Sequence, residues 1–465
     1  MLKVYNTLTR KLEVFKTLKE KEAKFFVCGV TPYDYSHLGH AKTYTQFDII
    51  VKYLKYKGYN VYYLQNITDM DDKIIKKANE QKVDWKDISR KYEKEYIEDM
   101  KNLGNDSVNK YARATDYMKE IVSQVKRLIE KGYAYKISDG WYFDLSKDKD
   151  YGKLAKRTSL EGEDAVSRID ENTEKRNKGD FCLLKISKPG EPYWEVNIEN
   201  EKFLSRPGWH IEDTAITEKE LGQQYDIHGG GIDLIFPHHE AEIAQMESIS
   251  GKKPFVKYWM HTGFVNVNKD KMSKSLGNFL TIKDVLKRYN KYIIRFLFLQ
   301  THYRKPIDFS EEALEQAKKT LQKLNEFMIS LESYKNEVKD NNKVEKLIEK
   351  TKKNFEKEMD NDFDTHNGIT VIFEFVKEVN KMIGEKNISN DNVKQIINFM
   401  REIDKVFGIL EEKSEIPKNI IKLAEERQEA RKKKDYKTSD KIREELKKLG
   451  YYLDDKEEGY VVKRL

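Results

Sequence analysis

Two short motifs far apart in the chain carry residues that could handle phosphate groups. His37 and His40 stand three residues apart in HLGH, and two lysines, Lys271 and Lys274, stand in KMSKS. Imidazole and ammonium groups can donate to phosphoryl oxygens, and a polar loop with two cations can neutralise charge as pyrophosphate leaves. Either motif alone is a weak signal. Together, in this order, they predict a nucleotide-triphosphate site that activates a carboxylate as an acyl-adenylate.

The elements around HLGH suit such a site. The apolar run 25–30 predicts a buried parallel strand, the residues 31–34 predict a turn, and apolar residues recur at helical spacing from Leu38 onward. HLGH therefore lies where a helix starts, and free N–H groups and the helix dipole attract phosphate there. Gly39 would let a nucleotide approach the backbone. The alternative is that both histidines are ordinary surface residues of a turn.

Composition limits the class of protein. The chain has 465 residues, of which 38% are hydrophobic, so it can bury several cores in three or four domains. Its net charge of +7 permits an RNA partner without requiring one. Two cysteines, Cys28 and Cys182, cannot form a disulfide framework. The N-terminus lacks the apolar core of a signal peptide and no run reaches transmembrane length, so we expect a cytoplasmic protein without membrane contact.

The pattern of elements changes along the chain. Strands and helices alternate to about residue 130, as in the first half of a parallel nucleotide-binding sheet. Residues 132–205 are rich in glycine, aromatic residues and turn signals, which predicts a β-rich insertion. The sheet is expected to resume near Arg206, with Gly229–Gly231 as a tight loop after a strand. From Glu311 the sequence predicts a helical bundle and then a small terminal module.

At this point the chain resembles the class I aminoacyl-tRNA synthetases, and the stretches between the motifs resemble the cysteinyl-tRNA synthetase family. The stretches that carry the resemblance are FVCGVTPYDYSHLGHAKTY, NITDMDDKI, GWYFD, YGKL, RPGWHIED, DIHGGGIDLIFPHHEAEIAQ, KMSKSLGNFLT and HYRKPIDFS. The resemblance covers essentially the whole chain. It implies an α/β fold with a Rossmann-like catalytic domain, a β-rich insertion, a helical bundle and a C-terminal module.

The resemblance also implies a division of the chain and a reaction. The expected divisions are 1–131 and 206–262 (the two halves of the Rossmann catalytic domain), 132–205 (connective insertion), 263–310 (KMSKS loop and stem-contact region), 311–412 (helical bundle) and 413–465 (anticodon-recognition module). L-Cysteine would be activated with ATP and Mg²⁺, then transferred to the 2′-hydroxyl at the 3′ end of tRNA(Cys). His37, Gly39, His40 and Lys274 would bind ATP, with Lys271 assisting. A monomer is the family expectation.

A metal site is indicated by PHHEAEIAQ. His238 and Glu242 lie four apart after Pro237, so both should project from one face of a starting helix, while His239 and Glu240 point elsewhere. Cys28, near the end of the strand before HLGH, could complete the site. The family holds zinc with two cysteines, a histidine and a glutamate, and this zinc binds the substrate's sulfur. Cys28, His238 and Glu242 match three of those positions.

The fourth position departs from the family, because RPGWHIED carries Asp213 where the family has cysteine. An aspartate keeps the negative charge, and zinc accepts a carboxylate oxygen. A harder donor should weaken the selectivity for soft metals and leave a more Lewis-acidic zinc. The alternative is that Asp213 caps a helix or forms a local salt bridge, with the metal absent or its site rebuilt.

Other residues take their roles from the resemblance. Trp209, Thr68 and Asp233, together with Cys28, match positions near the amino-acid pocket, although ordinary core packing would also explain Trp209. In the C-terminal stretch a cluster of basic residues is expected to begin a helix that contacts tRNA, and three tyrosines could stack on bases. The basic residues are Arg427, Arg431, Lys432, Lys433 and Lys434, and the tyrosines are Tyr451, Tyr452 and Tyr460. A charge run is more often a solvated face.

Two other functions stay open on the sequence alone. A small-molecule ligase of the mycothiol-ligase type would adenylate cysteine and join it to an amino sugar, but it has no use for an anticodon module. A catalytically silent RNA-binding paralogue is the second alternative, and the intact HLGH and KMSKS motifs argue against it.

Overall fold

The computed structural model describes residues 1–156, 172–268, 270–271, 279–411, 417–456 and 459–464. The chain forms two compact units, Met1–Leu410 and Glu411–Leu465. The domain boundaries within the first unit remain a prediction.

A five-stranded parallel sheet lies at the centre of the first unit, with the order β12-β11-β3-β4-β5. Its strands are β3 (Glu22–Val30), β4 (Asn60–Ile67), β5 (Lys110–Arg113), β11 (Tyr225–Gly231) and β12 (Val256–Thr262). Side chains of β3 alternate between the two faces of the sheet, as the pleat requires. Phe25 packs edge-on against Phe47 on one face, and Phe26 packs against His228 on the other. The buried parallel strand predicted over residues 25–30 is confirmed.

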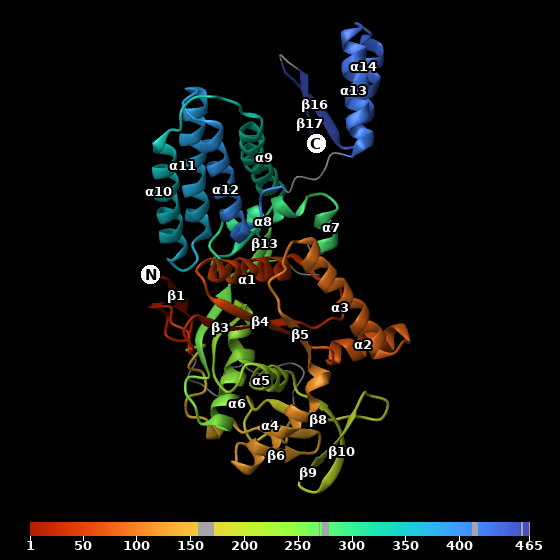
Figure 1. Ribbon diagram of the computed structural model, residues 1–465. Coiled ribbons are helices and arrows are strands. Elements are labelled where there is room, and N and C mark those ends of the chain that lie inside the picture. Colours follow the sequence, from red (N-terminus) through yellow and green to blue (C-terminus); the bar gives the residue numbers. More distant parts are fainter. Residues whose placement is uncertain (157–171, 269, 272–278, 412–416, 457–458, 465) are drawn as a thin grey trace. The chain divides into compact units, whose positions relative to one another are not determined.

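Helices cover both faces of this sheet (Figure 1). On one face lies α1 (Leu38–Tyr56); on the other lie α4 (Met118–Glu130), α5 (Trp209–Glu220) and α6 (Glu240–Ser250). Two further helices, α2 (Asp72–Gln81) and α3 (Trp85–Asn102), connect β4 to β5. The structure confirms the predicted Rossmann-like arrangement.

The two halves of the sheet meet where β3 pairs with β11. In open parallel sheets, ligands bind outside the carboxyl ends of the strands at such a change of strand order. The prediction of a loop at Gly229–Gly231 was wrong, because these glycines form the end of β11 itself. A Cβ atom on Gly229 would lie 2.5 Å from the ring of Phe47, so glycine is needed for the close approach of α1 to the strand.

The predicted β-rich insertion is a separate sheet with the order β6-β7-β8-β10-β9, in which neighbouring strands are antiparallel. Its strands are β6 (Ala134–Ile137), β7 (Gly140–Phe143), β8 (Cys182–Ile186), β9 (Trp194–Ile198) and β10 (Glu201–Pro207). Strand β10 runs almost directly into α5, so the insertion helps to place the start of that helix.

A small sheet with the order β14-β13-β15 contains residues that precede the KMSKS motif, and Lys271, the first residue of that motif. Its strands are β13 (Val265–Val267), β14 (Asp270–Lys271) and β15 (Ile307–Phe309). At the N-terminus, β1 (Lys3–Asn6) and β2 (Lys11–Val14) form an antiparallel hairpin.

The predicted helical bundle follows. Two helices precede it, α7 (Ile282–Leu286) and α8 (Lys291–Leu299). The bundle itself consists of α9 (Glu311–Ser333), α10 (Asn342–Met359), α11 (Thr365–Gly384) and α12 (Asn390–Phe407). The buried guanidinium of Arg295 joins this region to α1, the helix that covers one face of the sheet. It donates to Asp48 Oδ2 at 3.0 Å and to the carbonyl oxygen of Phe407 at 3.1 Å.

The second unit contains α13 (Lys418–Lys432), α14 (Tyr436–Lys448) and the antiparallel pair β16 (Tyr451–Lys456) and β17 (Gly459–Arg464). Ile420, Ile442, Leu446 and Tyr451 form its small core.

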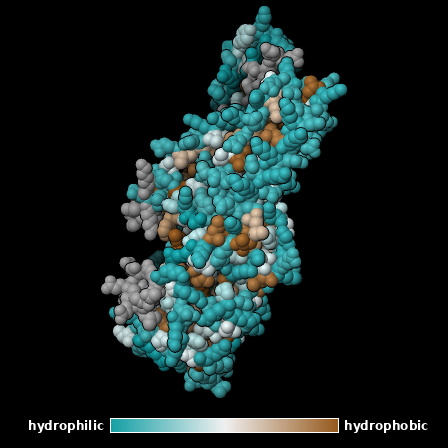
Figure 2. Space-filling view, turned by 90° about the vertical axis from the view of Figure 1, so that its left-hand side faces the viewer, coloured by the Kyte–Doolittle hydropathy of each residue, from teal (hydrophilic) through white to brown (hydrophobic). Residues whose placement is uncertain are grey.

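The face of the molecule in Figure 2 is mostly hydrophilic, with hydrophobic residues in small groups. Among the described residues, no helix is long and apolar enough to cross a membrane.

Candidate active site

The HLGH turn fixes the orientation of both its histidines. His37 caps the N-terminus of α1, because its Nδ1 accepts from the backbone N–H of Gly39 at 3.0 Å. The backbone N–H of His37 in turn donates to Nδ1 of His40 at 3.4 Å. The two rings stack with centroids 3.8 Å apart. A nitrogen that accepts carries no proton, so each ring carries its N–H at Nε2. Burial, and then the neighbouring His37, lower the pKa of His40 well below its usual value.

The segment that follows KMSKS lies against this turn. The N–H of Leu38 donates to the carbonyl oxygen of Leu280 at 3.2 Å, and the N–H of Ile282 donates to that of Ser36 at 2.9 Å. The ring of Phe279 packs edge-on against His37 at 5.4 Å. Lys271 ends β14, and Lys274 lies outside the described residues.

A cleft of about 490 Å³ opens at the carboxyl ends of β3 and β11. Its lining includes five of the residues predicted to form the site, namely Cys28, His37, Gly39, His40 and Asp233. The structure therefore brings the HLGH motif and two residues of the predicted amino-acid pocket, Cys28 and Asp233, to one cavity.

Trp209 and Thr68 do not line this cleft. Trp209 lines a smaller neighbouring pocket of about 80 Å³, and its ring stacks on His238 with centroids 4.2 Å apart. It is 42% exposed, so the core-packing explanation is wrong. Thr68 is buried, and its hydroxyl accepts from the amide of Asn66 at 3.3 Å.

Beside the cleft, Cys28, Asp213, His238 and Glu242 converge. Cys28 Sγ lies 3.2 Å from Asp213 Oδ2 and 3.9 Å from Glu242 Oε1. His238 Nε2 lies 3.1 Å from Asp213 Oδ2 and 3.4 Å from Glu242 Oε1. Atoms that share one zinc ion lie about 3.3–3.8 Å apart, so these spacings suit a metal site. Asp213 does not cap a helix; it lies inside α5 and is 1% exposed.

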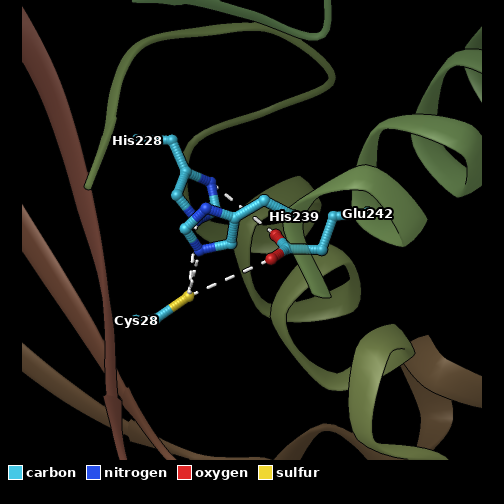
Figure 3. Close-up of side chains that lie close together, drawn as sticks. All are labelled: Cys28, His228, His239 and Glu242. Atoms are coloured by element: carbon cyan, nitrogen blue, oxygen red, sulfur yellow. Dashed lines mark hydrogen bonds and ion pairs between the residues drawn. The ribbon is translucent and has the colours of Figure 1, made fainter. Parts of the chain in front are cut away.

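Two histidines that the sequence reasoning did not assign belong to the same cluster. Nε2 of His239 lies 3.1 Å from Cys28 Sγ, and Nε2 of His228 lies 3.4 Å from it (Figure 3). The prediction that His239 points elsewhere was wrong. His239 and Glu242 are three residues apart, which also puts them on one face, and an irregular turn over Ile235–His239 precedes α6.

Glu240 does point away from the cluster, as predicted. Its Oε2 accepts from the backbone N–H groups of Leu154 and Ala155, each at 2.9 Å. These bonds tie the start of α6 to the segment after the insertion's first hairpin.

Further polar groups orient the cluster. Asn66 accepts from the N–H of Gly29 and donates to Asp213 Oδ1, both at 2.5 Å, which leaves Oδ2 of Asp213 facing Cys28 and His238. This role of Asn66 was not predicted. Asn66 lies near the carboxyl end of β4, next to β3, so its place at the site follows from the strand order.

The charges of the cluster favour a cation. Burial, and then Asp213 and Glu242, raise the pKa of Cys28 well above its usual value. Burial, and then Asp213, raise the pKa of Glu242. Three groups that ionise to anions thus crowd into one buried space, and buried anions are normally paired or bound to metal. The sulfur, nitrogen and oxygen donors fit a borderline ion such as zinc.

The basic residues of the second unit differ from their prediction. They end α13 instead of beginning a helix, because α13 already starts at Lys418 after Pro417. Arg427 is only 6% exposed, and Tyr451 is buried in the small core. Arg431, Lys432, Lys433 and Lys434 remain as the candidates for contact with RNA, and all four are exposed.

The fold and the paired motifs define a class I aminoacyl-tRNA synthetase. Residues 14–319 match the family model of the class I (C) tRNA synthetase catalytic domain, and residues 354–411 match the DALR domain. Methionyl-tRNA synthetase of Mycobacterium tuberculosis, solved with methionyl-adenylate, shares the fold at a TM-score of 0.63 and 15% identity, over 83% of this chain and 92% of that one.

The particular family follows from full-length relatives. The cysteine–tRNA ligases of Thermoplasma volcanium and Methanococcus maripaludis are each 46% identical to the chain. The first alignment covers 97% of this chain and 98% of the relative, and the second covers all of both. Residues 413–460 match the anticodon-binding domain of cysteinyl-tRNA ligase. The chain belongs to the cysteine–tRNA ligase family.

Proposed function

We propose that this chain is a cysteine–tRNA ligase that forms cysteinyl-adenylate from L-cysteine and ATP and passes the cysteinyl group to tRNA(Cys). The observation that carries the proposal is the shared cleft, in which the imidazoles of HLGH and the sulfur of Cys28 line one cavity. Such a cavity can hold the phosphates of ATP at one end and a cysteine side chain at the other.

In the first step the carboxylate of cysteine attacks the α-phosphorus of ATP and pyrophosphate leaves. The Nε2–H groups of His37 and His40 donate to phosphoryl oxygens as negative charge develops, and Gly39 admits the nucleotide to the backbone. Lys274, with Lys271 assisting, stabilises the leaving pyrophosphate. Mg²⁺ accompanies ATP.

In the second step the terminal ribose 2′-hydroxyl of tRNA attacks the carbonyl carbon of the adenylate. The carbon–oxygen bond to AMP breaks as the ester forms, so no covalent enzyme intermediate is needed. Positioning of the two substrates contributes to the acceleration expected here.

The metal site would serve the choice of amino acid. Cys28, Asp213, His238 and Glu242 would hold one Zn²⁺, which when bound supplies a Lewis acid that prefers a thiolate to an alcohol. This preference separates cysteine from serine, which a purely apolar pocket does poorly. Trp209, Thr68 and Asp233 would bound the amino-acid pocket, and the stacking of Trp209 on His238 supports its place beside the metal.

The second unit would read the tRNA. Its match to the anticodon-binding domain and its exposed lysines support contact with the acceptor RNA. We further propose the domain divisions given above, a monomer and a cytoplasmic location, where thiol groups remain reduced.

One assay separates this function from its alternatives. ATP–pyrophosphate exchange is measured with each amino acid, and transfer to total tRNA is then measured with those that support exchange. Exchange with cysteine followed by charging is the expected result. Exchange without charging would favour a small-molecule ligase that joins cysteine to an amino sugar, and no exchange would favour a silent RNA-binding paralogue.

A further inference from the structure

The buried cluster contains two sets of metal-binding side chains that share two members. The first ligand set is Cys28, Asp213, His238 and Glu242; the second ligand set is Cys28, His228, His239 and Glu242. Within each set the ligand atoms lie within 4.8 Å of one another, and every residue is buried. Both sets use Cys28 and Glu242, so they offer alternative positions for one ion.

The histidines of the second ligand set are already oriented toward Cys28. The sulfur of Cys28 lies 3.1 Å from Nε2 of His239 and 3.4 Å from Nε2 of His228. Glu242 approaches the same sulfur from α6 (Figure 3). Four different elements supply these side chains: His228 comes from β11, His239 from the turn before α6, Glu242 from α6 and Cys28 from β3.

The other ring nitrogen of each histidine is occupied. Nδ1 of His228 lies 2.7 Å from the hydroxyl of Tyr225, and Nδ1 of His239 lies 2.8 Å from Nε2 of His261. His261 in turn contacts the hydroxyl of Thr7 at 2.8 Å. Metal-binding histidines usually have their second nitrogen held in this way, which fixes the ring and raises its basicity.

Asp213 changes the balance between the two sets. The first set offers one sulfur, one nitrogen and two carboxylate oxygens, whereas the second offers one sulfur, two nitrogens and one carboxylate oxygen. Zinc and cobalt bind well to thiolate and imidazole, and a carboxylate is the harder donor. Because residue 213 is an aspartate and not a cysteine, the first set has no second soft sulfur donor. It therefore has no advantage in soft donors over the second set for binding zinc.

We propose that the two ligand sets are redundant in this chain: either His228 with His239 or Asp213 with His238 completes the binding of one Zn²⁺ held by Cys28 and Glu242. The inference rests on the metal site of the proposed function. The two proposals assign different roles to two residues. Under the present one, Asp213 is dispensable for holding the ion and His239 is a metal-binding residue.

The test compares Asp213→Ala, His239→Phe and the double variant in the full-length protein. Zinc is measured per chain after dialysis, and affinity is measured by competition with a chromogenic chelator. Each single variant should keep about one zinc ion, and the double variant should bind zinc more than about 100-fold more weakly than the wild type. Loss of a residue that only hydrogen-bonds to a metal ligand typically weakens binding by about 100-fold at most. Co²⁺-loaded Asp213→Ala should show two hyperfine-shifted imidazole N–H signals, from His228 and His239.

The controls address folding and function separately. His239→Gln, which keeps a hydrogen-bonding side chain beside His261, repeats the test should His239→Phe unfold, and His302→Asn changes a histidine outside the cluster. Thermal unfolding is recorded for each variant. Loss of zinc from Asp213→Ala alone, retention of zinc by the double variant, or two zinc ions per wild-type chain would each overturn the proposal. Cysteine-dependent pyrophosphate exchange by the wild type tests the proposed function independently.

Discussion

Nζ of Lys42 lies 2.6 Å from the carbonyl oxygen of Gly263. Lys42 is in the first turns of the helix that HLGH starts, and Gly263 links β12 to the small sheet that leads into KMSKS. The same ammonium group donates to the carbonyl oxygens of Tyr303 at 3.2 Å and Lys305 at 3.0 Å. One fully buried side chain thus joins the segments that lead into the two motifs proposed to bind phosphate.

We expect Lys42→Met to lower the free energy of unfolding by about 1–3 kcal/mol, because buried carbonyl oxygens lose their donor. Pyrophosphate exchange should slow as well, since the KMSKS segment loses a fixed point relative to HLGH. Urea unfolding measures the first effect. Lys55→Met, at an exposed position of the same helix, is the control and should stay within about 0.5 kcal/mol of the wild type. Equal stability of the two variants would contradict this view of Lys42.

His37→Asn separates the structural role of His37 from its proposed catalytic role. Asparagine is a good N-cap, so the free energy of unfolding should change by less than about 0.5 kcal/mol. The lost Nε2–H donor should lower kcat for cysteine-dependent pyrophosphate exchange by about 100- to 1,000-fold. A stable variant with a kcat close to that of the wild type would show that His37 only caps the helix.

Asp99 should make stability depend on pH. Burial raises its pKa to about 7 against the opposing charge of Lys283, and Glu95 and Glu98 add to the rise. Its carboxylate oxygens have no hydrogen-bond partner among the described residues. The folded protein therefore binds a proton here that the unfolded chain releases above about pH 4, so this contribution to stability is lost as pH rises toward 7 and beyond.

Asp99→Asn removes that titration. The Tm of the variant minus that of the wild type should increase between pH 5 and pH 8, measured by thermal unfolding in buffers of matched ionic strength. A difference that stays constant across this range would mean that Asp99 titrates at its ordinary value.

Asp213→Cys would give the first ligand set a second sulfur. The sulfur-to-metal charge-transfer absorption of the Co²⁺-loaded protein should roughly double, since two thiolates replace one. Zinc affinity should rise as well, because a thiolate is a softer ligand than a carboxylate. An unchanged absorption would show that residue 213 does not reach the metal.

Local patterns were enough to predict much of the fold. The strand over residues 25–30 and the helix after HLGH follow from an apolar run and a helical repeat, both of which lie within a few residues. Other local signals were missed. Pro417 marks the start of α13, so the basic run at Arg431 had to fall at the end of that helix.

The metal cluster was harder to predict, because its members come from separate strands and helices. His238 and Glu242 were indicated by their spacing of four and Cys28 by its place near the end of its strand, and the family resemblance matched all three. His228 and Asn66, in contrast, depend on which strands pair with β3. No periodicity within one segment reveals that order. His239 was within reach of sequence reasoning, since its spacing of three from Glu242 also places both on one helical face.

Aminoacylation of total tRNA with cysteine and with serine, measured on the purified full-length protein, decides whether this chain is a cysteine-specific tRNA ligase. We expect cysteine to be esterified to tRNA(Cys) and kcat/KM for serine to be lower by about 10⁴-fold or more, since the thiol is chosen chemically. Charging with serine at a comparable rate, or no charging of any tRNA with cysteine, would contradict this expectation.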